Sequence, residues 1–76
     1  MKLAELGCGE QGIIKGFGES ADPKLVRRFE ELGFTRGAKI EVRHFGPIGK
    51  DPIAVEVAGV LFGIGREQAK WIEVQK

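Results

Sequence analysis

Cysteine and histidine, two of the side chains that most often bind transition metals, are almost missing from this chain of 76 residues. The sequence holds one cysteine, Cys8, and one histidine, His44. A single cysteine cannot form an internal disulfide, and one thiol with one imidazole cannot complete the ligand set of a structural zinc site. We therefore expect no metal site and no cofactor. Stability must come from the packing of apolar side chains or from a partner surface.

A surplus of either charge is also lacking. Lysine and arginine number 12 and aspartate and glutamate 11, so the net charge is +1. A protein that holds nucleic acid through its phosphates normally carries a clear excess of basic residues. Tyrosine is absent, and the pattern of exposed aromatics interleaved with basic residues is missing. Nucleic-acid binding is disfavoured, but it stays the alternative function, together with general peptide binding by a small β-barrel.

Long apolar runs are missing as well. No run approaches the roughly 20 residues that a membrane-spanning helix requires, and residues 1–5 lack the apolar core of a signal peptide. We therefore expect a soluble, cytoplasmic protein, a compartment that suits a lone free thiol. A chain of this length has room for one small domain, so residues 1–76 are predicted to form it.

An amphipathic helix is predicted over residues 23–32. Possible capping side chains and a proline suited to the first helical turn stand at its start: Ser20, Asp22 and Pro23. Apolar residues recur at i, i+4 and i+7 and predict one buried face: Leu25, Phe29 and Leu32. Gly33 stands where a left-handed cap would end the helix, and Phe34 can fold back onto the last turn.

Alternating apolar residues predict five short strands. They cover residues 11–17, 39–45, 53–58, 60–64 and 71–75, with a single helical turn at 66–70. In the second strand His44 shares a face with Ile40 and Val42, which predicts a packing residue near the sheet edge rather than a ligand or base. Such a series of strands and turns predicts a mainly β fold, a small barrel or sandwich with one helix packed on an edge.

The sequence does not contain a convincing catalytic or nucleotide-binding motif. Residues 7–12 match G-x-G-x-x-G, but a β-branched strand follows where a dinucleotide-binding fold needs a helix. Cys8 lies in this glycine turn with no neighbouring cation to activate its thiol. No nucleophile, base and orienting group can be combined, so we do not expect an enzyme.

Two candidate docking surfaces remain. The first is a glycine-flanked loop with apolar side chains, made of Phe45, Pro47 and Ile48. The same residues also allow that Ile48 plugs an open end of the barrel. Asp51, in the same loop, can accept hydrogen bonds from nearby backbone amides. The second surface is the helix face with Arg27 and Arg28, either solvated or in contact with a partner, because arginine is enriched at interfaces.

Several segments together resemble the FeoA family of ferrous-iron transport proteins. Residues 28–37, RFEELGFTRG, resemble the family signature R-L-x-x-L-G-F-x-P-G, and residues 47–52, PIGKDP, resemble its P-L-G-D-P loop with Lys50 inserted. The opening L-x-x-G-x-x-G-x-I of residues 6–14 is similar too. The family's closing pattern is matched at Gly59, Ile64, Ala69, Ile72 and Val74. Gly65 and Gln68 depart from it by replacing an arginine and a glutamate.

The resemblance implies an SH3-like barrel of five strands, with one capping α-helix and a short helical turn near the C-terminus. It implies a cytoplasmic accessory protein of a bacterial ferrous-iron uptake system that binds no GTP and carries no iron itself. The implied partner is a membrane ferrous-iron transporter with a cytoplasmic GTPase domain, which would hold the protein at the inner membrane. Activation, inhibition and weak self-association are all left open.

The same fold is similar to the C-terminal domain of iron-dependent repressors of the diphtheria-toxin-repressor type. This chain shows no DNA-binding helices ahead of the predicted strands, so we do not expect a repressor.

Overall fold

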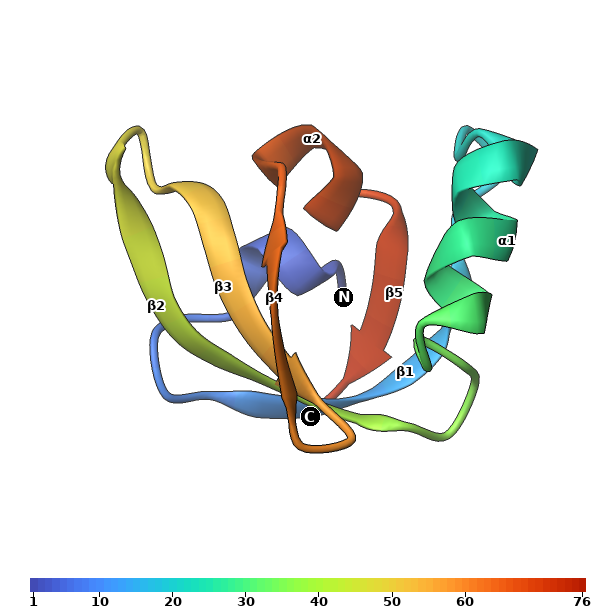
Figure 1. Cartoon of the computed structure of the whole chain (residues 1–76), viewed down its shortest axis with the longest axis horizontal. Helices are drawn as coiled ribbons and strands as arrows, with labels where there is room; N and C mark the ends of the chain where they lie inside the picture. The colour runs from blue at the N-terminus through green and yellow to red at the C-terminus, as the bar shows by residue number, and fades with distance from the viewer.

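Five strands form one antiparallel sheet in the computed structural model, which describes all of residues 1–76 (Figure 1). In chain order the elements are η1 (Leu3–Glu5), β1 (Gln11–Phe17), α1 (Pro23–Glu31), β2 (Lys39–Ile48), β3 (Asp51–Val57), β4 (Val60–Ile64), α2 (Arg66–Ala69) and β5 (Ile72–Gln75). The strand order is β4-β3-β2-β1-β5. The fold is mainly β, as predicted. The closed barrel is not confirmed, because β4 and β5 stand at opposite ends of this order and do not pair.

A single apolar cluster fills the inside of the curved sheet. The predicted alternation holds in the strands, since Ile40, Val42, Val55 and Ile72 have no exposed surface. The cluster also takes in residues before the first strand and after the helix, among them Leu3, Leu6 and Phe34. Burial of this apolar surface is the main favourable term in the stability of so small a domain.

Helix α1 begins as its sequence predicts. The carboxylate of Asp22 accepts a hydrogen bond from the backbone N–H of Lys24 at 2.9 Å, and Pro23 occupies the first helical position. Proline costs nothing there, because an N–H at that position would have no partner inside the helix.

The C-terminal end of α1 is a Schellman motif. Gly33 has a φ of +106° and its N–H donates to the carbonyl of Glu30 at 3.1 Å, while the N–H of Phe34 donates to the carbonyl of Phe29 at 2.9 Å. The two phenylalanine rings lie 5.2 Å apart between centroids. The predicted left-handed cap and the fold-back of Phe34 are therefore confirmed.

The buried face predicted for the helix is only partly correct. Phe29 is buried, Leu25 is half-buried, and Leu32 is 46% exposed. The helix ends at Glu31 and Leu32 is its C-cap residue, which faces the same groove as Leu25 and Phe29 rather than the core. Phe29 is held through stacking on Phe17 at 6.1 Å. The other apolar residues of that face line a surface groove instead.

The position predicted for His44 is wrong. The β2–β3 ladder shifts register between Val42 and His44, so His44 is exposed and Phe45 takes the next inward position opposite Ile53. A bulge adds one residue to a strand and reverses the alternation of faces beyond it. The bulge arises where β2 pairs with β3, and the apolar periodicity of β2 alone does not reveal it.

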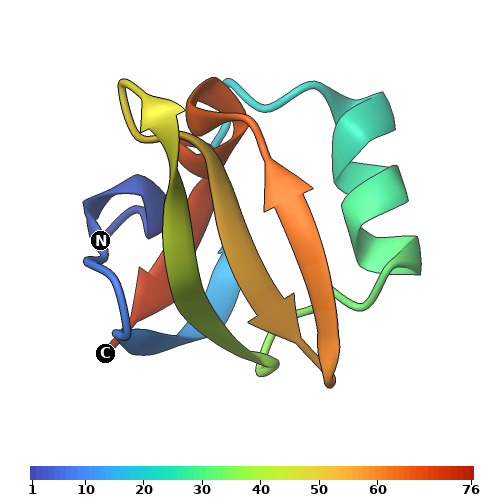
Figure 2. The ribbon, with the colours of Figure 1, turned by 60° about the vertical axis from the view of Figure 1, so that its left-hand side comes forward.

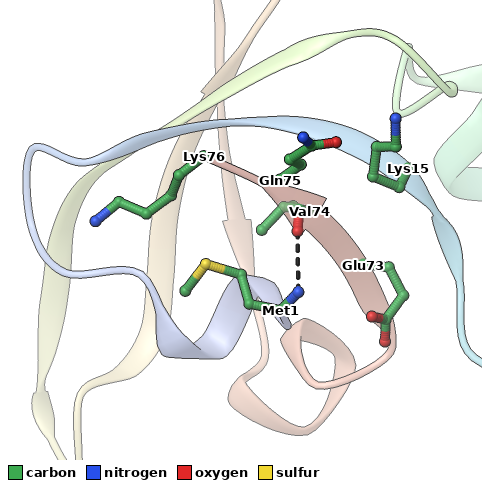
Figure 3. Close-up of a pocket in the computed structure, with 6 residues that line it drawn as sticks. All are labelled: Met1, Lys15, Glu73, Val74, Gln75 and Lys76. Carbon is green, nitrogen blue, oxygen red and sulfur yellow. Dashed lines mark hydrogen bonds between the residues drawn. The ribbon is translucent and has the colours of Figure 1, made fainter.

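The two outer strands of the sheet differ in their free edges. Along β5, the N-terminal ammonium of Met1 donates to the carbonyl of Val74 at 3.1 Å (Figure 3). The N–H of Val74 donates to the carbonyl of Met1 at 2.8 Å, and Lys2 pairs with Glu73 in an isolated bridge. The start of the chain therefore covers the edge of β5. No segment pairs with the outer edge of β4.

Candidate docking surfaces

The hairpin of β2 and β3 carries the first candidate surface. Ile48 pairs with Asp51, and Gly49 and Lys50 between them have φ values of 64° and 59°. Two consecutive positive φ values make the tight two-residue turn whose twist suits a hairpin. Both strands therefore reach further than predicted, and most of the expected loop over residues 46–52 is strand.

Gly46 lets the two strands of this hairpin approach closely. A Cβ atom at this position would overlap the carbonyl oxygen of Asp51 and would lie 2.7 Å from the nitrogen of Pro52. Only glycine fits beside that backbone without a shift. The tip therefore has a defined course rather than that of a loose loop.

Ile48 stands out at the tip. Its side chain is 82% exposed, more than any other large apolar residue of the chain. This exposure excludes the alternative in which Ile48 plugs an open end of the barrel. Pro47 beside it is exposed as well. The turn projects from the upper left of the molecule in Figure 1, away from the core.

Phe45 and Asp51 hold the hairpin in place. Phe45 is half-buried against the core cluster, and the Lys50 ammonium lies 5.4 Å from its ring centroid. Asp51 accepts a hydrogen bond at 3.0 Å from the backbone N–H of Arg66. The predicted partner of Asp51 was an amide in its own turn. The observed partner is the first residue of α2, so the carboxylate ties the hairpin to that helix.

The arginines of the second candidate surface lie elsewhere. Arg27 and Arg28 are exposed on α1, which Figure 1 shows at the opposite end of the molecule from the hairpin tip. The structure therefore brings Phe45, Pro47, Ile48 and Asp51 together but separates them from both arginines. No acidic side chain forms an ion pair with either arginine.

Arg27 and Arg28 also differ from each other. Arg28 lines a groove of about 270 Å³ with side chains of α1 and residues near β4: Leu25, Phe29, Leu32, Gly63 and Gln68. Arg27 faces another depression beside Pro23 and Lys24. The sequence points to both arginines, because arginine is enriched at interfaces, but not to the groove or to Gly63.

A third hollow, of about 390 Å³, lies beside β5 (Figure 3). Its charged side chains are Lys15, Glu73 and Lys76, and Figure 3 shows them pointing in different directions. A small-molecule site needs a few polar groups aimed at one place. This hollow lacks that arrangement.

The carboxyl of Glu10 has a lowered pKa. The hydrogen bond and charge of Lys76, together with a hydrogen bond from the N–H of Gly7 at 2.5 Å, lower the pKa of this carboxyl from its ordinary 4.5. The group lies away from the hairpin tip and ties the turn before β1 to the last residue.

The remaining candidate residues from the sequence do not come together in one site. The thiol of Cys8 is exposed and donates to the carbonyl of Arg43 at 3.1 Å. The glycine turn of residues 7–12 leads into β1 rather than a helix, as predicted. No three His, Cys, Asp or Glu side chains lie close enough to bind a metal ion together. None of the helices is long and apolar enough to cross a membrane.

Comparison of this chain with known proteins finds FeoA proteins by both sequence and structure. The sequence profile of the FeoA domain matches residues 1–76. The solution structure of a FeoA protein from Chlorobium tepidum is 40% identical, covering 99% of this chain and 69% of that one, with a TM-score of 0.90. No curated protein matches.

Two further solved structures show which fold this chain has. A zinc complex of FeoA from Stenotrophomonas maltophilia is 28% identical, covers 99% of this chain and 89% of that one, and has a TM-score of 0.86. That protein is described as a prokaryotic SH3 domain protein and a candidate activating factor of ferrous iron transport. A manganese-dependent transcriptional repressor is 20% identical over 99% of this chain and 40% of its own, with a TM-score of 0.84. At that identity the likeness shows the SH3-like fold alone.

Proposed function

Since this chain belongs to the FeoA family, we propose that it is an accessory protein of bacterial ferrous-iron uptake. It docks on the cytoplasmic part of a membrane transporter that carries a GTPase domain, and it supports transport from that position at the inner membrane. The description of the Stenotrophomonas relative as a candidate activating factor supports the iron-transport part of this proposal.

One observation carries the docking part, and it is the 82% exposure of Ile48. An exposed isoleucine at the end of a hairpin keeps its apolar surface in water unless a partner covers it. Burial of that side chain would contribute roughly 1.5–3 kcal/mol to an interface. Apolar anchors that fill a partner's pocket are typical centres of binding energy.

The contacts that hold the hairpin tip in one conformation favour docking. The half-buried ring of Phe45 and the bond from Arg66 to Asp51 hold the hairpin before any partner arrives. A surface that is already ordered loses little conformational entropy on binding. The partner-binding residues proposed here are therefore Ile48 and Pro47, with Phe45 and Asp51 as their supports.

Uptake of radiolabelled ferrous iron tests this function. In cells that lack the endogenous protein, the wild-type chain should restore uptake and Ile48→Asp should not. Ile13→Asp is the matched control, because it makes the same change at an isoleucine that is 38% exposed on β1. Cys8→Ser and His44→Ala should also restore uptake, since neither side chain belongs to the tip.

Stability measurements keep the result interpretable. Ile48→Asp should melt within a few degrees of the parent, because substitutions at exposed sites change stability by about 0.5 kcal/mol or less. Full uptake with Ile48→Asp would exclude the tip as the docking surface. Loss of uptake on Cys8→Ser would point to the thiol instead.

A further inference from the structure

Strand β4 offers free backbone groups at the open edge of the sheet. Val57 pairs with Val60 across the two-residue turn at residues 58–59. The closing pair of such a hairpin is hydrogen-bonded, and bonded pairs then alternate along an antiparallel ladder. Leu61 and Gly63 are therefore the residues whose N–H and C=O groups point away from β3. No other strand forms hydrogen bonds with these groups.

The composition of β4 does nothing to prevent pairing. Residues 60–64 hold no charge, no proline and no register shift, and Val60 and Leu61 are 52% and 57% exposed. Edge strands are normally protected by charges, prolines, bulges or a covering segment. The other outer strand, β5, has such a cover in Met1 and Lys2. The exposed edge is thus confined to one side of the sheet.

An apolar groove runs beside this edge. Figure 2 shows α1 next to β4, and Gly63 shares the groove of about 270 Å³ with Leu25, Phe29 and Leu32 of the helix region. A Cβ atom on Gly63 would meet nothing within 4 Å. Arg28 is the only charged side chain of the groove and has no acidic partner.

We propose that β4 binds an extended peptide segment of a partner protein by strand addition. The backbone of the segment bonds to Leu61 and Gly63, its alternate apolar side chains enter the groove, and an acidic side chain meets Arg28. Backbone bonds supply affinity in this mode of recognition, and the side-chain pockets supply specificity. The site is separate from the hairpin tip, so it does not depend on the docking of Ile48.

A second copy of this chain fits the edge less well. Its own α1 flanks its own β4, so two folded edges would bring two helices into the same space (Figure 2). Its Phe62 and Ile64 already point into its own core, which leaves only Val60 on that side for the groove. A single extended segment meets neither obstacle.

Amide hydrogen exchange, measured by NMR on the isotope-labelled chain, tests the proposal. The probe is a blocked synthetic peptide of about seven residues, alternating valine and threonine with one aspartate at an end, long enough to span β4. Without peptide, the amides of Leu61 and Gly63 should exchange fast and those of Val60 and Phe62 slowly. Added peptide should slow exchange at Leu61 and Gly63.

Paired variants separate the two kinds of contact. Gly63→Pro removes one outward N–H and should weaken peptide binding about tenfold, whereas Gly63→Ala keeps the N–H and should bind as the parent does. Arg28→Glu should weaken binding of the aspartate peptide and strengthen binding of a peptide with lysine in its place. Arg27→Glu makes the same change outside the groove and should have little effect. Ile48→Asp should leave peptide binding unchanged.

Three results would overturn the proposal. The first is unchanged exchange at Leu61 and Gly63 with saturating peptide. The second is a change confined to the groove residues Leu25 and Leu32, which would mean apolar contact without strand addition. The third is protection of Leu61 and Gly63 that rises with protein concentration in the absence of peptide, which would make a second copy the occupant.

Discussion

Replacing Gly33 by valine tests the end of α1, the local structure that holds Phe29 and Phe34 in the core. Gly33 has a φ of +106°, where a β-branched side chain is strained, and its N–H closes the Schellman motif with Glu30. The left-handed backbone alone costs a non-glycine residue about 1–2 kcal/mol. Branching at Cβ adds to this, because β-branched residues are rarely found at positive φ, although the nearest atom to a Cβ here, on Val57, lies 4.0 Å away.

We therefore expect Gly33→Val to lower the free energy of unfolding by about 2 kcal/mol. For a domain of this size that corresponds to roughly 8–16 °C in melting temperature. Urea titration followed by the fluorescence of Trp71, the only tryptophan, measures the change. The slope m should stay constant, because the unfolded surface is the same.

The matched control is Gly63→Val, the same substitution at a glycine without a positive φ and with open space at its Cβ position. Valine suits a strand, so this variant should be as stable as the parent or more stable. Gly33→Asn should lose less than Gly33→Val, since asparagine tolerates the left-handed region. A Gly33→Val variant as stable as the parent would refute the capping argument.

Two other outcomes follow from the structure. Phe29→Ala should cost about 3–5 kcal/mol by thermal or urea unfolding, because the buried ring packs against two others; a loss below about 1 kcal/mol would show that the helix is not anchored there. The lowered pKa of Glu10 stabilises the fold fully above pH 4.5 and ceases to do so as the pH falls through the folded-state pKa. The stability difference between the parent and Glu10→Gln should therefore shrink below pH 4.5 in urea titrations, and a difference that grows with acid would contradict the bond to Lys76.

The sequence predicts best where structure depends on near neighbours. Asp22 with Pro23 and Gly33 with Phe34 mark both ends of α1, and each acts within a few residues. The alternation of Ile40 and Val42 likewise identifies an inward face. These signals act through local backbone geometry, so one sequence suffices to predict them.

Predictions fail where distant segments decide the outcome. The bulge that turns His44 outward depends on pairing with β3, and the partner of Asp51 is an amide in α2. The exposure of Leu32 depends on how far α1 stands from β4. The cover of β5 by Met1 joins residues from the two ends of the chain. None of these contacts has a periodic or local signal.

Site-specific photo-crosslinking tests the central claim, that the hairpin tip docks on the transporter, most directly. A photoreactive amino acid replaces Ile48 in one variant and Arg27 in another, and both are expressed in cells whose membranes contain the transporter. We predict that irradiation links position 48, but not position 27, to the cytoplasmic part of the transporter. An adduct from position 27 alone, or no adduct from position 48 while the protein still supports iron uptake, would contradict the account.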